Sequence, residues 1–189
     1  MRCFIALPID QKTASALEKI SLQLQSLPWA KEVRWFPKEN YHLTLQFIGS
    51  KVDPHKVQKV INSMECWFAE GMSYFEAEIR RIQTFPNPRS PHTIVASLDA
   101  TIIMQYLVRE IEDHLKPIGL ERNKQAFRPH ISLGKIKPKA DTDSFYIPDE
   151  IAQPEDQWLT VDTITLYQSQ LTSNSPIYTP LKSIHLERY

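Results

Sequence analysis

Two short segments of the chain repeat one order of residue types: histidine, an apolar residue, a hydroxyl residue and leucine. Residues 42–45 are HLTL and residues 130–133 are HISL. Side chains alternate between the two faces of a β-strand, so a strand would place the histidine and the hydroxyl of each motif on one face. Leu43, Leu45 and Phe47 are expected on the opposite, buried face. Each motif therefore predicts an imidazole beside a hydroxyl, backed by apolar core.

The chemistry that suits this pair is phosphoryl transfer to water, in which one group takes a proton from the nucleophile and another gives one to the leaving oxygen. Histidine can do either near neutral pH. Thr44 and Ser132 can donate hydrogen bonds to the non-bridging oxygens of a phosphate held between the motifs, and no metal is then required. The alternative is that two apolar strands each contain a histidine and a hydroxyl by chance. The repeated polarity pattern instead favours His42 and His130 as a catalytic pair.

Apolar periodicity and turn residues predict the elements that position these motifs. Helices are expected over residues 11–27 with Asp10 as the N-cap, from Asp53 and Pro54 to Gly71, and over residues 101–115. Strands are expected over residues 2–7, 32–36, 41–48, 74–82, 93–98, 129–136, 159–170 and 178–188. The proline-rich segment 85–91 is expected to be a loop long enough to reach a ligand.

The order of these elements favours an α+β fold. Strands and helices alternate, but the late strands lack the crossover helices that a parallel sheet requires, so a mixed, mostly antiparallel arrangement is expected. The 189 residues are close to the roughly 100 to 200 residues of one domain. Because no linker divides the chain, residues 1–189 are expected to form a single domain.

Composition excludes several classes of protein. The apolar fraction of 42% and the charged fraction of 23% are ordinary for a globular protein. Lys and Arg balance Asp and Glu at 22 each, so any anion binding must be local. Cys3 and Cys66 have no metal-binding spacing, and no signal peptide or membrane span is evident, which indicates free thiols in the cytoplasm. We expect a monomer without an obligate protein partner.

The motifs and their flanks resemble the two-histidine phosphoesterase superfamily, and within it the bacterial and archaeal LigT-like RNA 2',3'-cyclic phosphodiesterases. Residues 2–7 are similar to the family's opening strand, residues 33–49 to its first motif and residues 127–133 to its second. Residues 166–171 and Tyr178 resemble its closing strands. The resemblance covers nearly the whole chain. It implies a bilobed, pseudo-twofold fold in which the sheets line a central cleft and the helices pack outside.

The resemblance also implies a reaction and its residues. Water would open a 2',3'-cyclic phosphate at an RNA end or on a cyclic nucleotide, the bond to the 3' oxygen would break, and a 2'-phosphate would result. His42 would be the general acid and His130 the general base, with Thr44 and Ser132 holding the phosphate. Ser132 stands where threonine is usual and keeps the hydroxyl.

Lys135 is a second departure, because the family's second motif commonly continues to an arginine at this position. Lysine keeps the positive charge but loses the planar, bidentate donor group. Strict alternation puts Lys135 on the face opposite His130, so it can reach a phosphate only through a bulge or bend, which Gly134 could permit. Lys135 is therefore a conditional phosphate-binding candidate.

Other residues are candidates for contact with RNA. The segment from Arg122 to Lys139 contains six basic residues and no acidic one, and it either tracks an RNA backbone or forms a solvated strand edge. Arg128 lies close to the second motif. Phe85 and Tyr41, like Trp35, could stack on a terminal base. A place in the core is favoured for any one of them, and Phe85, in its proline-rich loop, is the preferred stacking candidate.

Cofactors are not indicated. The remaining histidines, His55, His92, His114 and His185, lack the spacing of a metal site. The sequence has no phosphate-binding or dinucleotide-binding glycine pattern, so neither ATP nor NAD is implied.

Two alternatives to the hydrolase remain. Another reaction of the same superfamily, such as 2',5' ligation of RNA ends or the opening of a different cyclic phosphate, would use the same histidines. A non-catalytic RNA-binding module would use the same groove without turnover.

Overall fold

Strands β3 and β6, which begin with the two histidines, lie at the centre of one antiparallel sheet. The computed structural model describes residues 1–69, 71–120 and 123–187. The sheet order is β7-β4-β5-β6-β3-β1-β8-β9, with β2 also paired to β6. The strands are β1 (Cys3–Pro8), β2 (Val33–Trp35), β3 (His42–Gly49), β4 (Phe75–Phe85), β5 (Thr93–Leu98), β6 (His130–Ile136), β7 (Trp158–Val161), β8 (Thr163–Gln170) and β9 (Ile177–His185).

The sheet has two matching halves, each with a motif strand at its inner edge. Three further strands follow outward on each side, β5, β4 and β7 beyond β6, and β1, β8 and β9 beyond β3. In both halves a strand and a helix precede the motif strand along the chain, β1 and α1 before β3, with the short β2 between α1 and β3, and β5 and α3 before β6. Among the described residues, one ladder pair, Leu43 opposite Ile131, joins β3 to β6. The predicted α+β, pseudo-twofold fold is confirmed.

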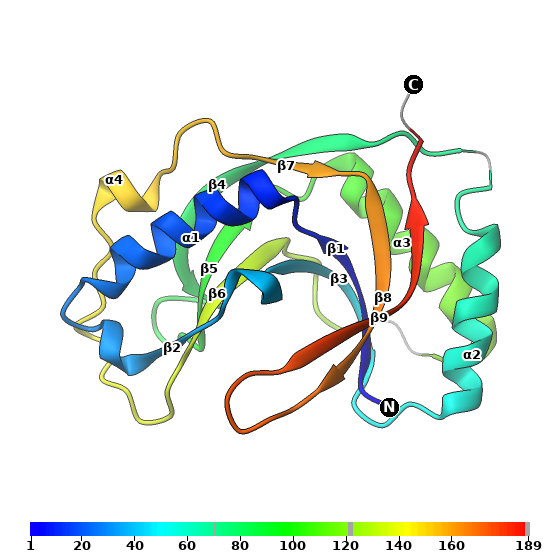
Figure 1. The fold of residues 1–189 in the computed structure, drawn as a ribbon, viewed down its shortest axis with the longest axis horizontal. Helices are drawn as coiled ribbons and strands as arrows, with labels where there is room; N and C mark the ends of the chain where they lie inside the picture. Colours follow the sequence, from blue (N-terminus) through cyan, green and yellow to red (C-terminus); the bar gives the residue numbers. More distant parts are fainter. Residues whose placement is uncertain (70, 121–122, 188–189) are drawn as a thin grey trace.

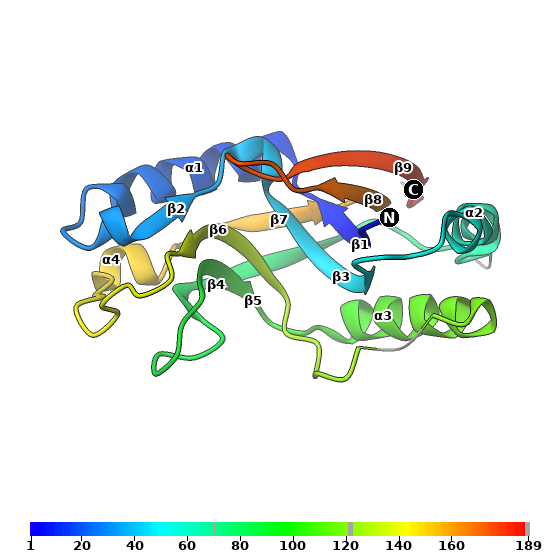
Figure 2. The ribbon, with the colours of Figure 1, turned by 90° about the horizontal axis from the view of Figure 1, so that it is seen from below.

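Helices pack against the sheet from opposite sides (Figures 1 and 2). Asp10 caps α1 by accepting a hydrogen bond of 2.8 Å from the Thr13 amide, as predicted, and also accepts one from the Thr160 amide of β7. These bonds hold α1 over the half that contains β7. The α3 helix contacts β3 in the other half. The helices are α1 (Gln11–Gln25), α2 (Pro54–Ser63), α3 (Ile102–Leu115) and α4 (Asp149–Ala152), and none of those described is long and apolar enough to cross a membrane.

Each motif strand contains a β-bulge at the leucine that ends its motif. On β3, Ala6 pairs with Thr44 and Ile5 with Gln46, so Leu45 is the extra residue. On β6, Val95 pairs with Ser132 and Ile94 with Gly134, so Leu133 is the extra residue. A bulge reverses the side-chain alternation that follows it. The residue five positions after each histidine therefore returns to the histidine's face.

The bulges change the expected face of Phe47, and they supply the bend that Lys135 needs to reach a phosphate. Phe47 pairs with Phe4, which shares a face with Ala6 and hence with Thr44, so the prediction that Phe47 lies on the core face is wrong. Gln46 occupies the buried position instead. Lys135 pairs with Thr93, which shares a face with the partners of Ser132 and His130, so Lys135 lies on the histidine side of β6.

Two predicted elements differ from the structure. The expected strand over residues 159–170 is divided at Asp162, where the chain leaves its pairing with β4 and begins to pair with β1. The second helix ends at Ser63 and continues only as a single turn from Met64 to Cys66. Its apolar pattern extends further because Met64 and Trp67 are also buried.

Gly134 is required where β2 crosses the second motif strand. A Cβ atom at this position would lie 2.6 Å from Val33 Cγ1 and 3.2 Å from the Arg34 carbonyl oxygen. Contacts this short force the backbone or the neighbouring side chains to move. Gly134 therefore permits the close pairing of β2 with β6.

We expect Gly134→Ala to lower the free energy of unfolding by about 1 to 3 kcal/mol, the usual cost of overpacking. Urea denaturation measures the change. Val33→Ala removes the nearest opposing atom, so the glycine substitution should cost less in that background than in the wild type. Equal costs in both backgrounds would show that the predicted contact is not the cause.

Candidate active site

The two motifs meet across the Leu43 and Ile131 pair, whose side chains are fully buried. Extending the antiparallel register by one residue in each direction puts His42 opposite Ser132 and Thr44 opposite His130. The histidines then lie on a diagonal, for which sheet geometry gives a Cα separation of about 7 to 8 Å. Each imidazole is thus next to the hydroxyl of the other motif as well as that of its own.

Both imidazoles are oriented by a backbone carbonyl two residues earlier. His42 Nδ1 lies 2.8 Å from the Asn40 carbonyl oxygen, and His130 Nδ1 lies 2.7 Å from that of Arg128. A carbonyl oxygen can only accept a hydrogen bond, so Nδ1 carries a proton in each ring. Nε2 is therefore the atom at which each imidazole gains or loses a proton.

Aromatic rings hold each imidazole from the side. His42 is 4.9 Å from the ring of Phe4 on β1 and 4.9 Å from that of Tyr178 on β9, which meets it edge to face. His130 stacks on Phe85 at 4.2 Å. These contacts restrict rotation of the imidazoles.

The residue that supplies each carbonyl also secures the segment that carries the aromatic ring. The Asn40 side-chain amide donates to the Pro176 carbonyl oxygen at 2.9 Å, next to Tyr178. Arg128 Nη1 donates to the Pro86 carbonyl oxygen at 2.9 Å, and its guanidinium lies 4.5 Å from the centre of the Phe85 ring. Asn40 and Arg128 thus have equivalent positioning roles in the two halves.

Both histidines favour their neutral forms. Burial is the main cause that lowers the pKa of His42, the nearby His130 lowers it further, and the hydrogen bond to Asn40 acts in the opposite direction. Burial likewise lowers the pKa of His130, with a smaller contribution from the Arg128 charge and an opposing one from the hydrogen bond to its carbonyl. A bound anion between the rings would reverse this preference by stabilising a protonated imidazole.

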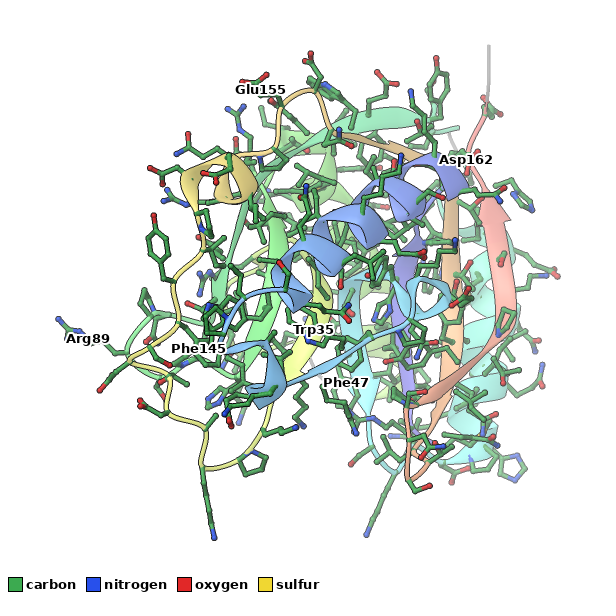
Figure 3. All side chains as sticks on the ribbon, turned by 60° about the vertical axis from the view of Figure 1, so that its left-hand side comes forward. Trp35, Phe47, Arg89, Phe145, Glu155 and Asp162 are labelled. Atoms are coloured by element: carbon green, nitrogen blue, oxygen red, sulfur yellow. The ribbon has the colours of Figure 1, made fainter. Side chains whose placement is uncertain are left out.

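An open groove of about 760 Å³ extends from the histidine face of the sheet toward α3. Thr44 and His130 form one end of it, and Phe47, Phe85 and Phe127 supply aromatic walls. Arg2 lies over the Phe47 ring at 4.7 Å, and Figure 3 shows where Phe47 lies on the fold. The groove thus combines one of the two proton-exchanging histidines, His130, with surfaces on which planar groups can stack.

The other predicted site residues lie at different distances from the histidines. Phe85 and Arg128 lie at the site but contact His130 and its supporting loop. Lys135 is exposed and lines a neighbouring groove. The prediction that Tyr41 contacts a base is wrong, because its side chain is only 5% exposed and bonds toward Ser21 of α1.

Sequence reasoning missed most of the aromatic support around His42. Phe4 and Tyr178 come from strands far apart in the chain, so no local pattern places them beside the first motif. Burial raises the pKa of Tyr178, and the charges of Arg2 and Arg34 act against this rise. In the part of the chain that the structure describes, no group of three or more His, Cys, Asp or Glu residues is arranged to hold a metal ion.

Two matching half-sheets present a pair of carbonyl-anchored histidines on one face, which is the arrangement that the resemblance to two-histidine phosphoesterases implies. The family model described as LigT like phosphoesterase matches residues 7–95. The sequence is 27% identical over 187 residues to the RNA 2',3'-cyclic phosphodiesterase of Thermotoga maritima, covering 99% of this chain and 96% of the relative. The protein of that name from Archaeoglobus fulgidus is 29% identical, with 96% and 98% covered.

Solved structures agree on the fold. E. coli LigT in its apo form superposes with a TM-score of 0.75 at 20% identity, covering 99% of this chain and 98% of LigT. The TT0787 protein of Thermus thermophilus gives the same TM-score and identity, covering 98% of each chain. The chain is thus similar in sequence to the LigT-like phosphoesterases over residues 7–95 and shares their fold along nearly its whole length, which is the resemblance that its motifs indicated.

We expect both histidines to be Nδ1-protonated neutral rings near pH 6.5, the ordinary pKa of histidine. Long-range ¹H–¹⁵N NMR spectra distinguish the two tautomers and follow the titration of each ring. A pKa above 6.5, or a proton on Nε2 of the neutral ring, would contradict the geometry. The folded-state pKa values of the two histidines lie below the unfolded value, so protonation favours the unfolded chain. The stability that the two neutral rings provide is therefore complete above about pH 6.5 and is lost as the pH falls further.

Proposed function

We propose that the protein is an RNA 2',3'-cyclic phosphodiesterase that hydrolyses the cyclic phosphate to a 2'-phosphate with His42 and His130. The observation that carries the proposal is the placement of both imidazoles on one face of the sheet, each with Nδ1 fixed and Nε2 available. The curated relatives that align along nearly the whole chain have the same name. RNA ends and 2',3'-cyclic nucleotides are the proposed substrates.

The proposed reaction needs one proton at each side of the phosphate. Nε2 of neutral His130 removes a proton from water, and the resulting hydroxide forms a bond to phosphorus. The bond from phosphorus to the 3' oxygen breaks, and this oxygen takes the proton of His42 Nε2. Exchange with solvent then restores the starting protonation states. Lone pairs and protons balance without a redox partner.

Thr44 and Ser132 are proposed to hold the phosphate while the protons move. Their hydroxyls lie on the histidine face, one from each motif strand. Hydrogen bonds from both to the non-bridging oxygens would keep the phosphorus between the two Nε2 atoms. The anion would also raise the pKa of His42, which must be protonated to act as the acid.

We further infer that residues 1–189 act as a single, monomeric unit in the cytoplasm. The continuous sheet supports one unit, because β7 and β8 are consecutive strands that pair in different halves. Cys3 and Cys66 are both free thiols, which is common in a reducing compartment.

Replacing either His42 or His130 with Ala should lower turnover of a 2',3'-cyclic nucleotide by about 10² to 10⁴, because each removes one proton-transfer group. His55→Ala, at an exposed position on α2, is the matched control and should retain wild-type turnover. Circular dichroism and urea unfolding establish that each variant is folded. A folded His42 or His130 variant with wild-type turnover would exclude the mechanism.

Product analysis separates this function from its alternatives. An RNA that ends in a 2',3'-cyclic phosphate should give only a 2'-phosphate, identified by ³¹P NMR and by its sensitivity to phosphatase. A 3'-phosphate would contradict the assignment of the leaving oxygen, and a 2',5'-linked product would identify a ligase. Binding of the RNA without any turnover would identify a non-catalytic module.

The pH dependence of kcat/KM should be bell-shaped with its maximum on the acidic side of pH 6.5. This ratio reports the free enzyme, in which both pKa values are lowered. On the acidic limb, kcat/KM falls at low pH because the base, His130, must be neutral. On the basic limb, kcat/KM declines below the usual pH for a histidine because the acid, His42, must be protonated. The profile of kcat should extend to higher pH because bound phosphate raises the pKa of the acid. A kcat/KM maximum above pH 8 would contradict these assignments.

A further inference from the structure

A second groove, separate from the aromatic one, is strongly basic. It has a volume of about 600 Å³ and is formed by the loop before β5, the end of β6 and the segment that follows β6. Its cationic side chains are Arg89, Lys135, Lys137 and Lys139, with His92 beside them, and no carboxylate residue is among those that line it. The whole chain has equal numbers of acidic and basic residues, so this groove is a local concentration of positive charge.

The walls of the basic groove are held by specific hydrogen bonds. The Asn87 side-chain oxygen accepts from the amides of Arg89 and Ser90, each at 3.0 Å, which fixes the loop before β5. The Ile136 amide donates to the His92 carbonyl oxygen at 2.9 Å. The backbone is thus arranged before any ligand arrives.

Most of the cationic groups in the groove remain available. Lys137 Nζ donates to the Lys31 carbonyl oxygen at 2.6 Å, so one charge is held in place. Among the described residues, Arg89, Lys135 and Lys139 take part in none of the ion pairs. Figure 3 shows the Arg89 side chain extending outward from its loop. These ammonium and guanidinium groups can therefore bind an external anion.

Lys135 connects the basic groove to the histidines. The bulge at Leu133 puts Lys135 on the same face as His130, and Arg34 of β2 is its cross-strand partner. Positive charge thus continues from the histidine face of β6 into the groove.

We propose that the basic groove binds phosphodiester groups of the RNA strand on the 5' side of the cyclic phosphate. This inference rests on the proposed function. A phosphodiester chain presents regularly spaced anions, and a row of lysine and arginine residues complements them independently of sequence. The first groove has the aromatic walls that suit bases, whereas the second has charge and no aromatic lining.

The proposal predicts a dependence on substrate length. A cyclic mononucleotide places its single phosphate between the histidines and reaches none of the cations beyond Lys135. An RNA oligonucleotide of eight residues also fills the groove, so its kcat/KM should exceed that of the mononucleotide and should fall more steeply with salt, since each phosphate contact adds to the salt dependence.

The test compares Arg89→Glu combined with Lys139→Glu against Lys59→Glu as a matched charge reversal. Lys59 is exposed on α2, at the opposite end of the molecule from the groove loops (Figures 1 and 2). The groove variant should lose about tenfold or more in kcat/KM for the octamer, with a smaller salt slope, and should keep wild-type kcat/KM for the mononucleotide. Lys59→Glu should change neither. Equal losses on both substrates, or no length dependence in the wild type, would overturn the proposal.

Binding measurements keep this test separate from the proposed function. Fluorescence anisotropy with a labelled, cyclic-phosphate-ended octamer and His42→Ala protein measures groove occupancy without turnover. If the wild type shows no hydrolysis, the function fails, while weaker octamer binding by the groove variant still supports the groove. Unchanged binding by that variant overturns the groove even if hydrolysis occurs. Polyglutamate of equal charge serves as a competitor beside unlabelled RNA. If it displaced the labelled RNA as effectively as unlabelled RNA does, the groove would be a general polyanion surface and the assignment would be overturned.

Discussion

The pairing of Leu43 with Ile131 is the contact on which the geometry of the site depends. It fixes the register of the two motif strands, and because side chains alternate along a strand, a slip of one residue would turn an entire motif away from its partner. Both side chains are fully buried, so such a slip would also expose apolar surface to water. The stability of the core and the meeting of the two histidines are therefore maintained by the same interaction.

Proton chemistry at the site depends on a different kind of constraint, the two carbonyl groups that bind the Nδ1 atoms. Burial disfavours charge on the rings, while the carbonyls determine which nitrogen exchanges protons. Burial thus sets how readily each histidine is protonated, and the carbonyls set which nitrogen atom takes the proton. The aromatic neighbours Phe85 and Tyr178 then limit the directions in which each Nε2 can face.

Much of this arrangement could be predicted from the sequence because it is local. The alternation within each motif, the capping by Asp10 and the strand over residues 93–98 follow from short-range patterns, and the structure confirms them. The bulges at Leu45 and Leu133 could not be predicted, since they depend on how neighbouring strands pair. The positions of Phe47 and Tyr178 follow from those non-local pairings, as does the burial of Tyr41 beneath α1.

The two groups that anchor the imidazoles are main-chain carbonyls, which do not depend on the residue type. Every amino acid has a main-chain carbonyl, so a substitution at position 40 or 128 leaves the acceptor for the imidazole in place. The side chains at these positions are then free to specialise in securing nearby segments. In this chain the two halves have done so with chemically unrelated residues, an amide at Asn40 and a guanidinium at Arg128. The backbone thus preserves a symmetry between the two halves that the side chains at these positions do not share.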